Sequence, residues 1–216
     1  MSSTSHLASQ ISTSVAQKCK VSGSCSVMLT GGRTAAQLYE VWRASGEFPL
    51  LRNIQFFFGD ERCVPPDDAE SNYGLAMRTL FKYGVPATCK ITRMDAGQID
   101  RDAAAWEYER QLPKAIDILL LSMGEDGHIA SLFPGSSALC ETHRRVLPVK
   151  APKPPFERLT VTPCVITQAQ KVFVMAFGEN KTAVYQRAKL APSDVSELPA
   201  RLVLNATWFF DSQTEI

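Results

Sequence analysis

Short apolar runs alternate along this chain of 216 residues with segments whose apolar residues recur every three or four positions. The apolar runs are typical of buried strands and occupy 25–30, 54–65 and 114–123. The three- or four-residue spacing predicts amphipathic helices over 7–19, 34–45, 73–84, 100–112 and 180–190. This alternation favours an α/β fold of the Rossmann-like kind, a mostly parallel sheet with helices on both faces.

The second half of the chain is less regular. We predict two strands around a polar turn within 158–178, the first interrupted by Pro163, and a last short strand over 200–205. The segment 134–157 is rich in proline and basic residues, and strand-like sequence resumes directly after it. We therefore expect a surface excursion within a single domain over 1–216, of which residues 1–6 are flexible.

The composition is that of an ordinary globular protein, with 45% hydrophobic and 21% charged residues. The formal net charge of +1 gives no overall attraction to nucleic acid or to an anionic membrane surface. No apolar run approaches the ~20 residues that a membrane-spanning helix needs. We expect partners of neither kind, so any preference for an anion has to come from a local cluster of basic side chains.

The cysteines and the two ends of the chain favour a cytoplasmic protein. The six cysteines show no CxxC or other metal-ligand spacing and are predicted to be reduced thiols. The first ten residues lack the basic and apolar stretches of a secretory signal, and the last four, QTEI, match no peroxisomal or lipidation signal.

Polar clusters follow four of the predicted strands at the points where they end. In open α/β sheets, ligands bind outside the carboxyl ends of the strands, where loops lead into helices. The clusters occupy 30–34, 59–62, 124–128 and 178–181. Because the carboxyl ends of parallel strands share one edge of a sheet, we expect the four clusters to converge on one site.

The cluster TGGRT, residues 30–34, leaves two interpretations open. Gly31 and Gly32 allow a sharp bend that exposes backbone N–H groups at a helix start, where the Thr34 hydroxyl can also bind an anion. The same residues suit an ordinary tight turn in which Thr34 caps the helix. Neither GxGxxG nor GxxxxGK[ST] is present, so the usual nucleotide-binding fingerprints are missing.

Four charged residues lie at other strand or helix ends. Asp60 and Arg62, two positions apart in an extended segment, face the same side and could form an ion pair or bind an anionic sugar. Arg158 and Lys181 could be solvated surface cations or could bind phosphate. A guanidinium would do so through two N–H groups, and an ammonium as a point charge.

His128 is the strongest candidate for catalysis, because it alone of three histidines follows a buried strand in a glycine-rich loop. An imidazole titrates near neutral pH and can take a proton from water and return it to a leaving group. Asp126, two residues earlier, could fix the tautomer of the ring. No HxH, HxxxH or HExxH spacing occurs, which argues against a zinc site, while a structural role in the loop stays open.

Several stretches taken together resemble the 6-phosphogluconolactonases, within the wider superfamily that includes glucosamine-6-phosphate deaminase. The matching stretches are TGGRTAAQLY, FFFGDERCVPPDDAESNYG, LLLSMGEDGHIASLFPGS, RLTVTPCVI, GENKTAV and ATWFFD. They follow the order of the family along most of the chain, and the second and third are the most specific in combination.

The resemblance implies hydrolysis of 6-phospho-D-glucono-1,5-lactone to 6-phosphogluconate, the second step of the oxidative pentose phosphate pathway. Because lactones also hydrolyse unaided, general base catalysis, oxyanion stabilisation and positioning could suffice, and we expect no metal or cofactor. The resemblance makes His128 the catalytic base, and by its position Asp126 would orient the ring. Asp60 and Arg62 resemble the acidic and basic pair of the family's pocket. The residues that resemble the phosphate-binding set are Gly31, Gly32, Thr34, Arg158 and Lys181.

Two features depart from the family pattern. Arg33 and Ala35 stand where family members often have serine and proline, and Arg33 could itself contact the phosphate. The strand that often precedes the first helix is missing or shortened, which leaves one edge of the sheet undetermined.

Phe133 distinguishes the two chemistries of the superfamily. Deaminases typically have DGHIAFNEP, with a glutamate close to the histidine, whereas this chain has DGHIASLFP, with Phe133 in the glutamate position. A phenyl ring cannot relay a proton, which favours lactone hydrolysis. Separately, we expect a monomer or a weak homodimer. The alternatives are a glucosamine-6-phosphate deaminase/isomerase, a non-catalytic sugar-phosphate sensor and a nucleotide-binding Rossmann protein.

Overall fold

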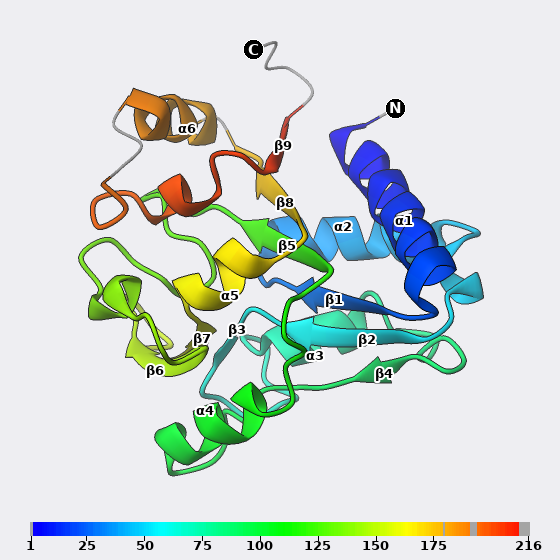
Figure 1. The fold of residues 1–216 in the computed structure, drawn as a ribbon, viewed down its shortest axis with the longest axis horizontal. Coiled ribbons are helices and arrows are strands. Elements are labelled where there is room, and N and C mark those ends of the chain that lie inside the picture. Colours follow the sequence, from blue (N-terminus) through cyan, green and yellow to red (C-terminus); the bar gives the residue numbers. More distant parts are fainter. Residues whose placement is uncertain (1, 179, 191–193, 212–216) are drawn as a thin grey trace.

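The computed structural model describes residues 2–178, 180–190 and 194–211. Its main element is a six-stranded sheet in the order β4-β2-β1-β5-β8-β9, in which every pairing is parallel (Figure 1). The strands are β1 Cys25–Leu29, β2 Ile54–Phe58, β4 Lys90–Ile91, β5 Ile118–Ser122, β8 Lys171–Ala176 and β9 Thr207–Phe210. The mostly parallel sheet predicted from the sequence is confirmed.

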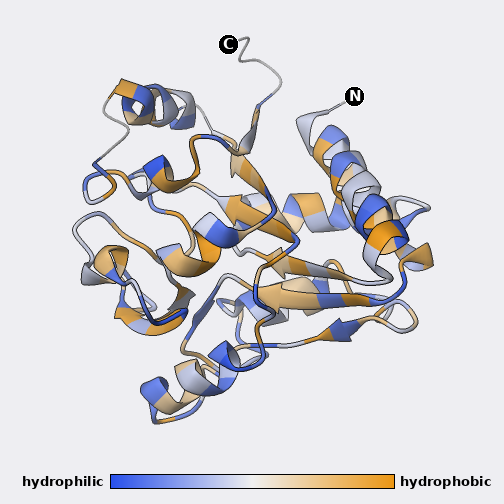
Figure 2. Ribbon diagram, in the orientation of Figure 1, coloured by the Kyte–Doolittle hydropathy of each residue, from blue (hydrophilic) through white to orange (hydrophobic). Residues whose placement is uncertain are grey.

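Helices cover both faces of this sheet, as predicted. One face packs against α1 Ser3–Ser22, α2 Arg33–Ala44 and α3 Asn72–Arg78, and the other against α4 Arg101–Glu109, α5 Pro163–Gln168 and α6 Lys181–Leu190. Within β1 the side chains alternate between the two faces. Val27 and Leu29 pack on the side of α1, α2 and α3, and Met28 packs on the side of α4, α5 and α6. Figure 2 shows strands that are mostly hydrophobic (orange), between helices that carry both hydrophobic (orange) and hydrophilic (blue) residues. None of the described helices is both long and apolar enough to cross a membrane.

The first helix, α1, is longer than predicted. The hydroxyl of Ser2 caps its start, and Gly23, with a φ of +76°, ends it. Leu7 and Ile11 belong to its buried stripe. The helix therefore begins inside the segment 1–6 that we expected to be flexible, of which residue 1 lies outside the described residues. In the described chain no strand precedes α1, and the edges of the sheet are β4 and β9.

A second, antiparallel sheet corrects the prediction of one strand over 54–65. The chain leaves the six-stranded sheet after β2, and β3 Asp60–Arg62 pairs instead with β7 Glu157–Val161. Gly59 is the junction, because its N–H donates to the carbonyl of Leu29 in β1 while its own carbonyl accepts from Val161 in β7. Asp60 and Arg62 thus lie on a different sheet from the aromatic strand that precedes them.

The segment expected to be an irregular excursion contains the third strand of this sheet, β6 Val146–Lys150. Pro148 lacks a backbone N–H and is tolerated because β6 is the edge strand in the order β3-β7-β6. The prediction for 134–157 is therefore wrong for these five residues.

Local chemistry explains the remaining differences. Pro163 is in the first turn of α5, a position that favours proline, so it starts a helix and does not interrupt a strand. The strand predicted over 200–205 is replaced by a 3-10 helix, and the last strand is β9. The 3-10 helices of the described chain are η1 Phe48–Leu50, η2 Ser137–Cys140 and η3 Pro199–Val203.

Candidate active site

A cavity of about 690 Å³ opens beyond the carboxyl ends of β1, β5 and β8, and residues of β3 and β7 contribute to its wall. All ten residues singled out from the sequence line it: Gly31, Gly32, Arg33, Thr34, Asp60, Arg62, Asp126, His128, Arg158 and Lys181. The structure therefore brings the four polar clusters together in space, as expected. The role of each residue stays a prediction at this point.

The loop after β1 faces the cavity with its glycines. The end of β1 is fixed by the buried Tyr39 hydroxyl, which donates to the Thr30 carbonyl at 2.6 Å and accepts the Thr30 N–H at 3.0 Å. Gly32, with a φ of +93°, is the residue before α2 and provides no side-chain cap. The helix begins at Arg33, so Thr34 is not its cap, and among the described residues the Thr34 hydroxyl has no hydrogen-bond partner.

His128 and Asp126 form a closely bonded pair in the loop after β5. Nδ1 of His128 lies 2.5 Å from Oδ1 of Asp126, and the same oxygen accepts the backbone N–H of His128 at 3.1 Å. Gly124 makes room for the ring, because a Cβ atom there would lie 2.1 Å from it. Gly127 supplies the left-handed turn between them, with a φ of +83°.

The charge on Asp126 determines which nitrogen of His128 is available. Partial burial alone would raise the pKa of Asp126, but the hydrogen bonds and the charge of His128 outweigh it and lower the pKa to about 2. An ionised carboxylate only accepts hydrogen bonds, so Nδ1 carries the proton. Nε2 is then the acceptor nitrogen of the neutral ring and the one left for a ligand.

Phe133 lies against the catalytic candidate itself. Its ring centroid is 4.8 Å from that of His128, and its side chain is buried. The Arg158 guanidinium also lies near this ring, 5.6 Å from the Phe133 centroid. The apolar ring thus fills the position beside the imidazole and offers it no hydrogen-bonding group.

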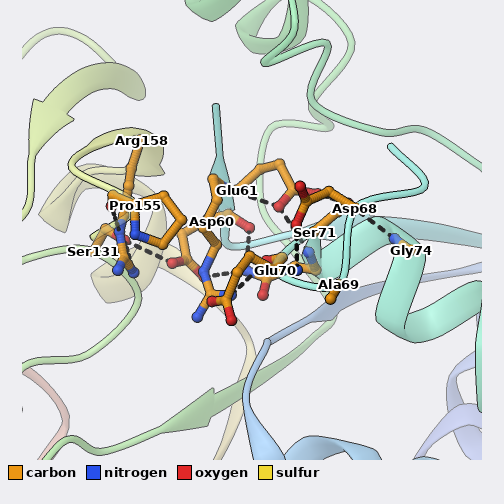
Figure 3. A network of polar contacts seen from close by, with 12 residues as sticks. Asp60, Glu61, Asp68, Ala69, Glu70, Ser71, Gly74, Ser131, Pro155 and Arg158 are labelled. Carbon is orange, nitrogen blue, oxygen red and sulfur yellow. Dashed lines mark hydrogen bonds and ion pairs between the residues drawn. The ribbon is translucent and has the colours of Figure 1, made fainter. Parts of the chain in front are cut away.

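The wall formed by β3 and β7 is a network of polar contacts, drawn in Figure 3. Asp60 is buried and accepts the Ser131 hydroxyl at 2.6 Å. Arg158 is also buried, and its Nε donates to the carbonyl of Pro155 at 3.1 Å. The expected alternative of an ion pair between Asp60 and Arg62 is wrong, because Arg62 instead reaches Glu70, 3.4 Å away.

Lys181 approaches the cavity from the start of α6. Its ammonium donates to the carbonyl of Met123 at the end of β5. Burial lowers the pKa of Lys181, and the positive charge of Arg33 lowers it further, although the nearby Glu125 and Asp126 act in the opposite direction. A bound anion would therefore stabilise the charged form of this partly buried ammonium, which lies near another cation.

The cavity also contains residues that the sequence analysis missed. Asn72, Ser122 and Asn180 line it, and Lys153 adds a fifth basic side chain from the loop between β6 and β7. The proline-rich sequence around Lys153 indicated only a surface loop, because strand β6, which brings this loop to the cavity, was not predicted. Five cations and three carboxylates line the cavity, so it favours an anionic ligand although the whole chain is nearly neutral.

No group of three His, Cys, Asp or Glu side chains suited to hold a metal ion occurs in the part of the chain that the structure describes. The polar lining of the cavity, with its hydroxyl, amide and basic groups, suits the phosphate and hydroxyl groups of an organic anion.

Comparison with known proteins gives a consistent set of similarities. Over residues 2–210 the chain matches the family described as glucosamine-6-phosphate isomerases/6-phosphogluconolactonase. A 6-phosphogluconolactonase of Rattus norvegicus is 40% identical over 168 residues, which cover 71% of this chain and 64% of that protein. One of Pseudomonas putida is 35% identical over 190 residues, which cover 85% of this chain and 77% of that protein.

Solved structures agree with the sequence comparison. The structure of 6-phosphogluconolactonase from Trypanosoma brucei is similar with a TM-score of 0.83 and 27% identity, over 98% of this chain and 92% of that chain. This similarity extends over the six-stranded sheet and the second sheet alike, since it covers nearly the whole chain.

Proposed function

This chain belongs to the family of glucosamine-6-phosphate isomerases and 6-phosphogluconolactonases, and we propose that it hydrolyses 6-phospho-D-glucono-1,5-lactone to 6-phosphogluconate in the oxidative pentose phosphate pathway. The observation that carries this proposal is the His128–Asp126 pair at the wall of a cation-rich cavity. Relatives named 6-phosphogluconolactonase support the choice of reaction.

Substrate binding would use the cations around the cavity. The phosphate fits the exposed amides of Gly31 and Gly32 at the start of α2, where the helix dipole favours an anion. Residues that would add contacts to it are Thr34, Arg158 and Lys181, with Arg33, Arg62 and Lys153 nearby. Arg158 keeps Nη2 without a partner among the described residues and so has an N–H group to offer.

The chemistry would start from neutral His128. Nε2 takes a proton from water as the oxygen attacks C1 of the lactone, and Asp126 stabilises the imidazolium that forms. Loop amides or a nearby cation stabilise the tetrahedral oxyanion. The proton then passes from Nε2 to the ring oxygen as the C1–O bond breaks, which gives the open-chain carboxylic acid. The sum is one water added to one lactone, with no metal or cofactor taking part.

The structure disfavours a glucosamine-6-phosphate deaminase. That reaction moves a proton between carbon atoms and needs an additional acid or base beside the histidine. Phe133 offers none in the position where deaminases have their glutamate, and the Asp60 carboxylate is hydrogen-bonded to Ser131 and Asn72. A cytoplasmic location, a monomeric or weakly dimeric state and the absence of nucleic-acid partners stay predictions from the sequence.

The test is a lactonase assay in which the 6-phosphogluconate formed is measured after subtraction of spontaneous hydrolysis. We expect wild-type activity to fall by about 10²–10⁴-fold in His128→Ala, with binding of 6-phosphogluconate retained. His143→Ala, which removes an exposed histidine outside the cavity, is the matched control. Full activity in His128→Ala would remove that residue as the base, and ammonia release from glucosamine 6-phosphate would favour the deaminase.

A further inference from the structure

Asn72, the first residue of α3, lines the cavity but has no place in the mechanism above. Its side chain is buried, with 1% of its surface exposed. Its Nδ2 donates to the backbone carbonyl of Asp60 at 2.9 Å and to Oδ1 of Asp60 at 3.1 Å. Because both partners are acceptors, the amide fits only with Nδ2 toward Asp60, and its oxygen faces the opposite way.

The Asn72 oxygen lies against the glycine loop after β1. A Cβ atom added to Gly31 would lie 1.8 Å from Oδ1 of Asn72 and 2.3 Å from its Cγ. Gly31 has no positive φ, so the closeness of Asn72 is what excludes a side chain there. Among the described residues no donor reaches Oδ1, and a buried carbonyl without a partner is a cost that a purely structural asparagine does not require.

Glu61 prevents Asn72 from moving away from this contact. The buried Glu61 carboxylate accepts the backbone N–H of Asn72 at 2.7 Å. It also accepts the hydroxyl of Ser71 at 3.1 Å (Figure 3). Glu61 also adjoins Asp60 in β3, so the start of α3 and β3 form one hydrogen-bonded unit. A displacement of Gly31 would consequently be transmitted to Asp60.

We propose that Asn72 is a positioning residue that couples the phosphate loop at Gly31 to the Asp60 carboxylate, and thereby fixes the spacing between two walls of the substrate site. This inference rests on the proposed function of the cavity. Binding energy from a phosphate assists chemistry at a distant carbon only if both ends of the substrate are held in register.

The coupling can be measured in a double-mutant cycle of Gly31→Ala, Asn72→Ala and the pair. The single change at Gly31 should raise KM for the lactone and Kd for 6-phosphogluconate by about tenfold, because its methyl group meets Asn72. KM and Kd of the double variant should agree with those of Asn72→Ala within about twofold, because the Asn72 side chain that the new methyl group would meet is then absent. Gly46→Ala is the matched control, since a Cβ atom there meets nothing within 4 Å.

A second variant, Asn72→Asp, isolates the contact with Asp60. It keeps the bulk toward Gly31 but replaces the donor by an oxygen that faces another carboxylate. Asn72→Asp should lower kcat more than Asn72→Ala does. Combined with Gly31→Ala, it should not return KM and Kd toward the wild-type values. This comparison is available even if Gly31→Ala alone does not fold.

Three results would overturn the inference. The first is that the fold-changes in KM and Kd of the two single variants multiply in the double variant, and the second is an equal kcat in Asn72→Asp and Asn72→Ala. The third is a coupling that appears in thermal unfolding but not in KM and Kd. Failure of the proposed function gives a different pattern. If the wild type opens no lactone while the cycle in Kd for 6-phosphogluconate is non-additive, the reaction is wrong and the coupling stands.

Discussion

Oδ1 of Asp126 accepts two hydrogen bonds from His128, one from ring Nδ1 at 2.5 Å and one from the backbone N–H at 3.1 Å. The two contacts fix both the position of the ring and its tautomer. They direct Nε2, and not Nδ1, to the ligand, which sets the first prediction.

Asp126→Asn should lower kcat by about 10²-fold or more while KM changes little. An asparagine has no charge to stabilise the protonated ring, and its N–H₂ group can reverse the tautomer. Steady-state kinetics with the lactone checks this. Glu125→Gln removes a neighbouring carboxylate and should have a far smaller effect on kcat; equal losses in both variants would contradict a specific role for Asp126.

Acid unfolding should report the same pair. Because the folded-state pKa of Asp126 is lowered from 3.8 to about 2, its ionised form stabilises the folded protein at pH values above 3.8. That stabilisation is lost as the pH falls from about 4 to about 2. The difference in melting temperature between wild type and Asp126→Asn should therefore shrink over this interval, and a constant difference would contradict the assignment.

Binding should weaken at alkaline pH through Lys181. Burial lowers its pKa below the ordinary value of 10.5, so its charge disappears at a lower pH than that of a free lysine. Calorimetric Kd for 6-phosphogluconate should consequently rise as the pH increases toward 10.5. Lys181→Arg should remove this dependence because a guanidinium stays charged. A wild-type Kd that does not change with pH would argue against phosphate contact by Lys181.

Lys153 should contribute to KM and not to kcat. It lines the cavity from an exposed loop, and no hydrogen bond or ion pair holds it among the described residues. Lys153→Met should raise KM about 1.5- to fivefold, the range for one exposed, screened charge. Lys150→Met is the control, since Lys150 is exposed on the same segment but does not line this cavity.

Replacement of Phe133 tests the apolar contact with His128. In Phe133→Glu a carboxylate would lie beside the imidazole and favour its protonated form, so the acid side of the pH–rate profile should move to higher pH. Phe133→Leu keeps the site apolar and should retain the wild-type profile. The profiles of kcat/KM from pH 5 to 9 decide the matter, and identical profiles in both variants would contradict the contact.

Local patterns were sufficient to predict the sheet and the convergence of the site. Continuous apolar runs such as that of β5 identify buried parallel strands, and polar residues placed directly after them share one edge by geometry alone. His128 was found in this way, since the signal lies within a few residues of the strand end.

Contacts between distant segments could not be predicted from spacing. The strand over 54–65 was divided because β3 pairs with β7, about a hundred residues further along the chain, and only the junction at Gly59 hints at the change. The contact of Asn72 with Gly31 likewise depends on how α3 packs against the first loop. Pro163 is different, because its preference for a first helical turn could have been recognised from the sequence.

The division of the chain at Gly59 has a consequence for the whole molecule. Lys181 enters the cavity from the end of the parallel sheet, whereas Arg158 belongs to the antiparallel one. An anion that contacts both side chains would link the two sheets and restrict their movement relative to each other. Saturating 6-phosphogluconate should therefore slow amide hydrogen exchange along β3 and β7, beyond the residues that it contacts, and should raise the cooperativity of unfolding.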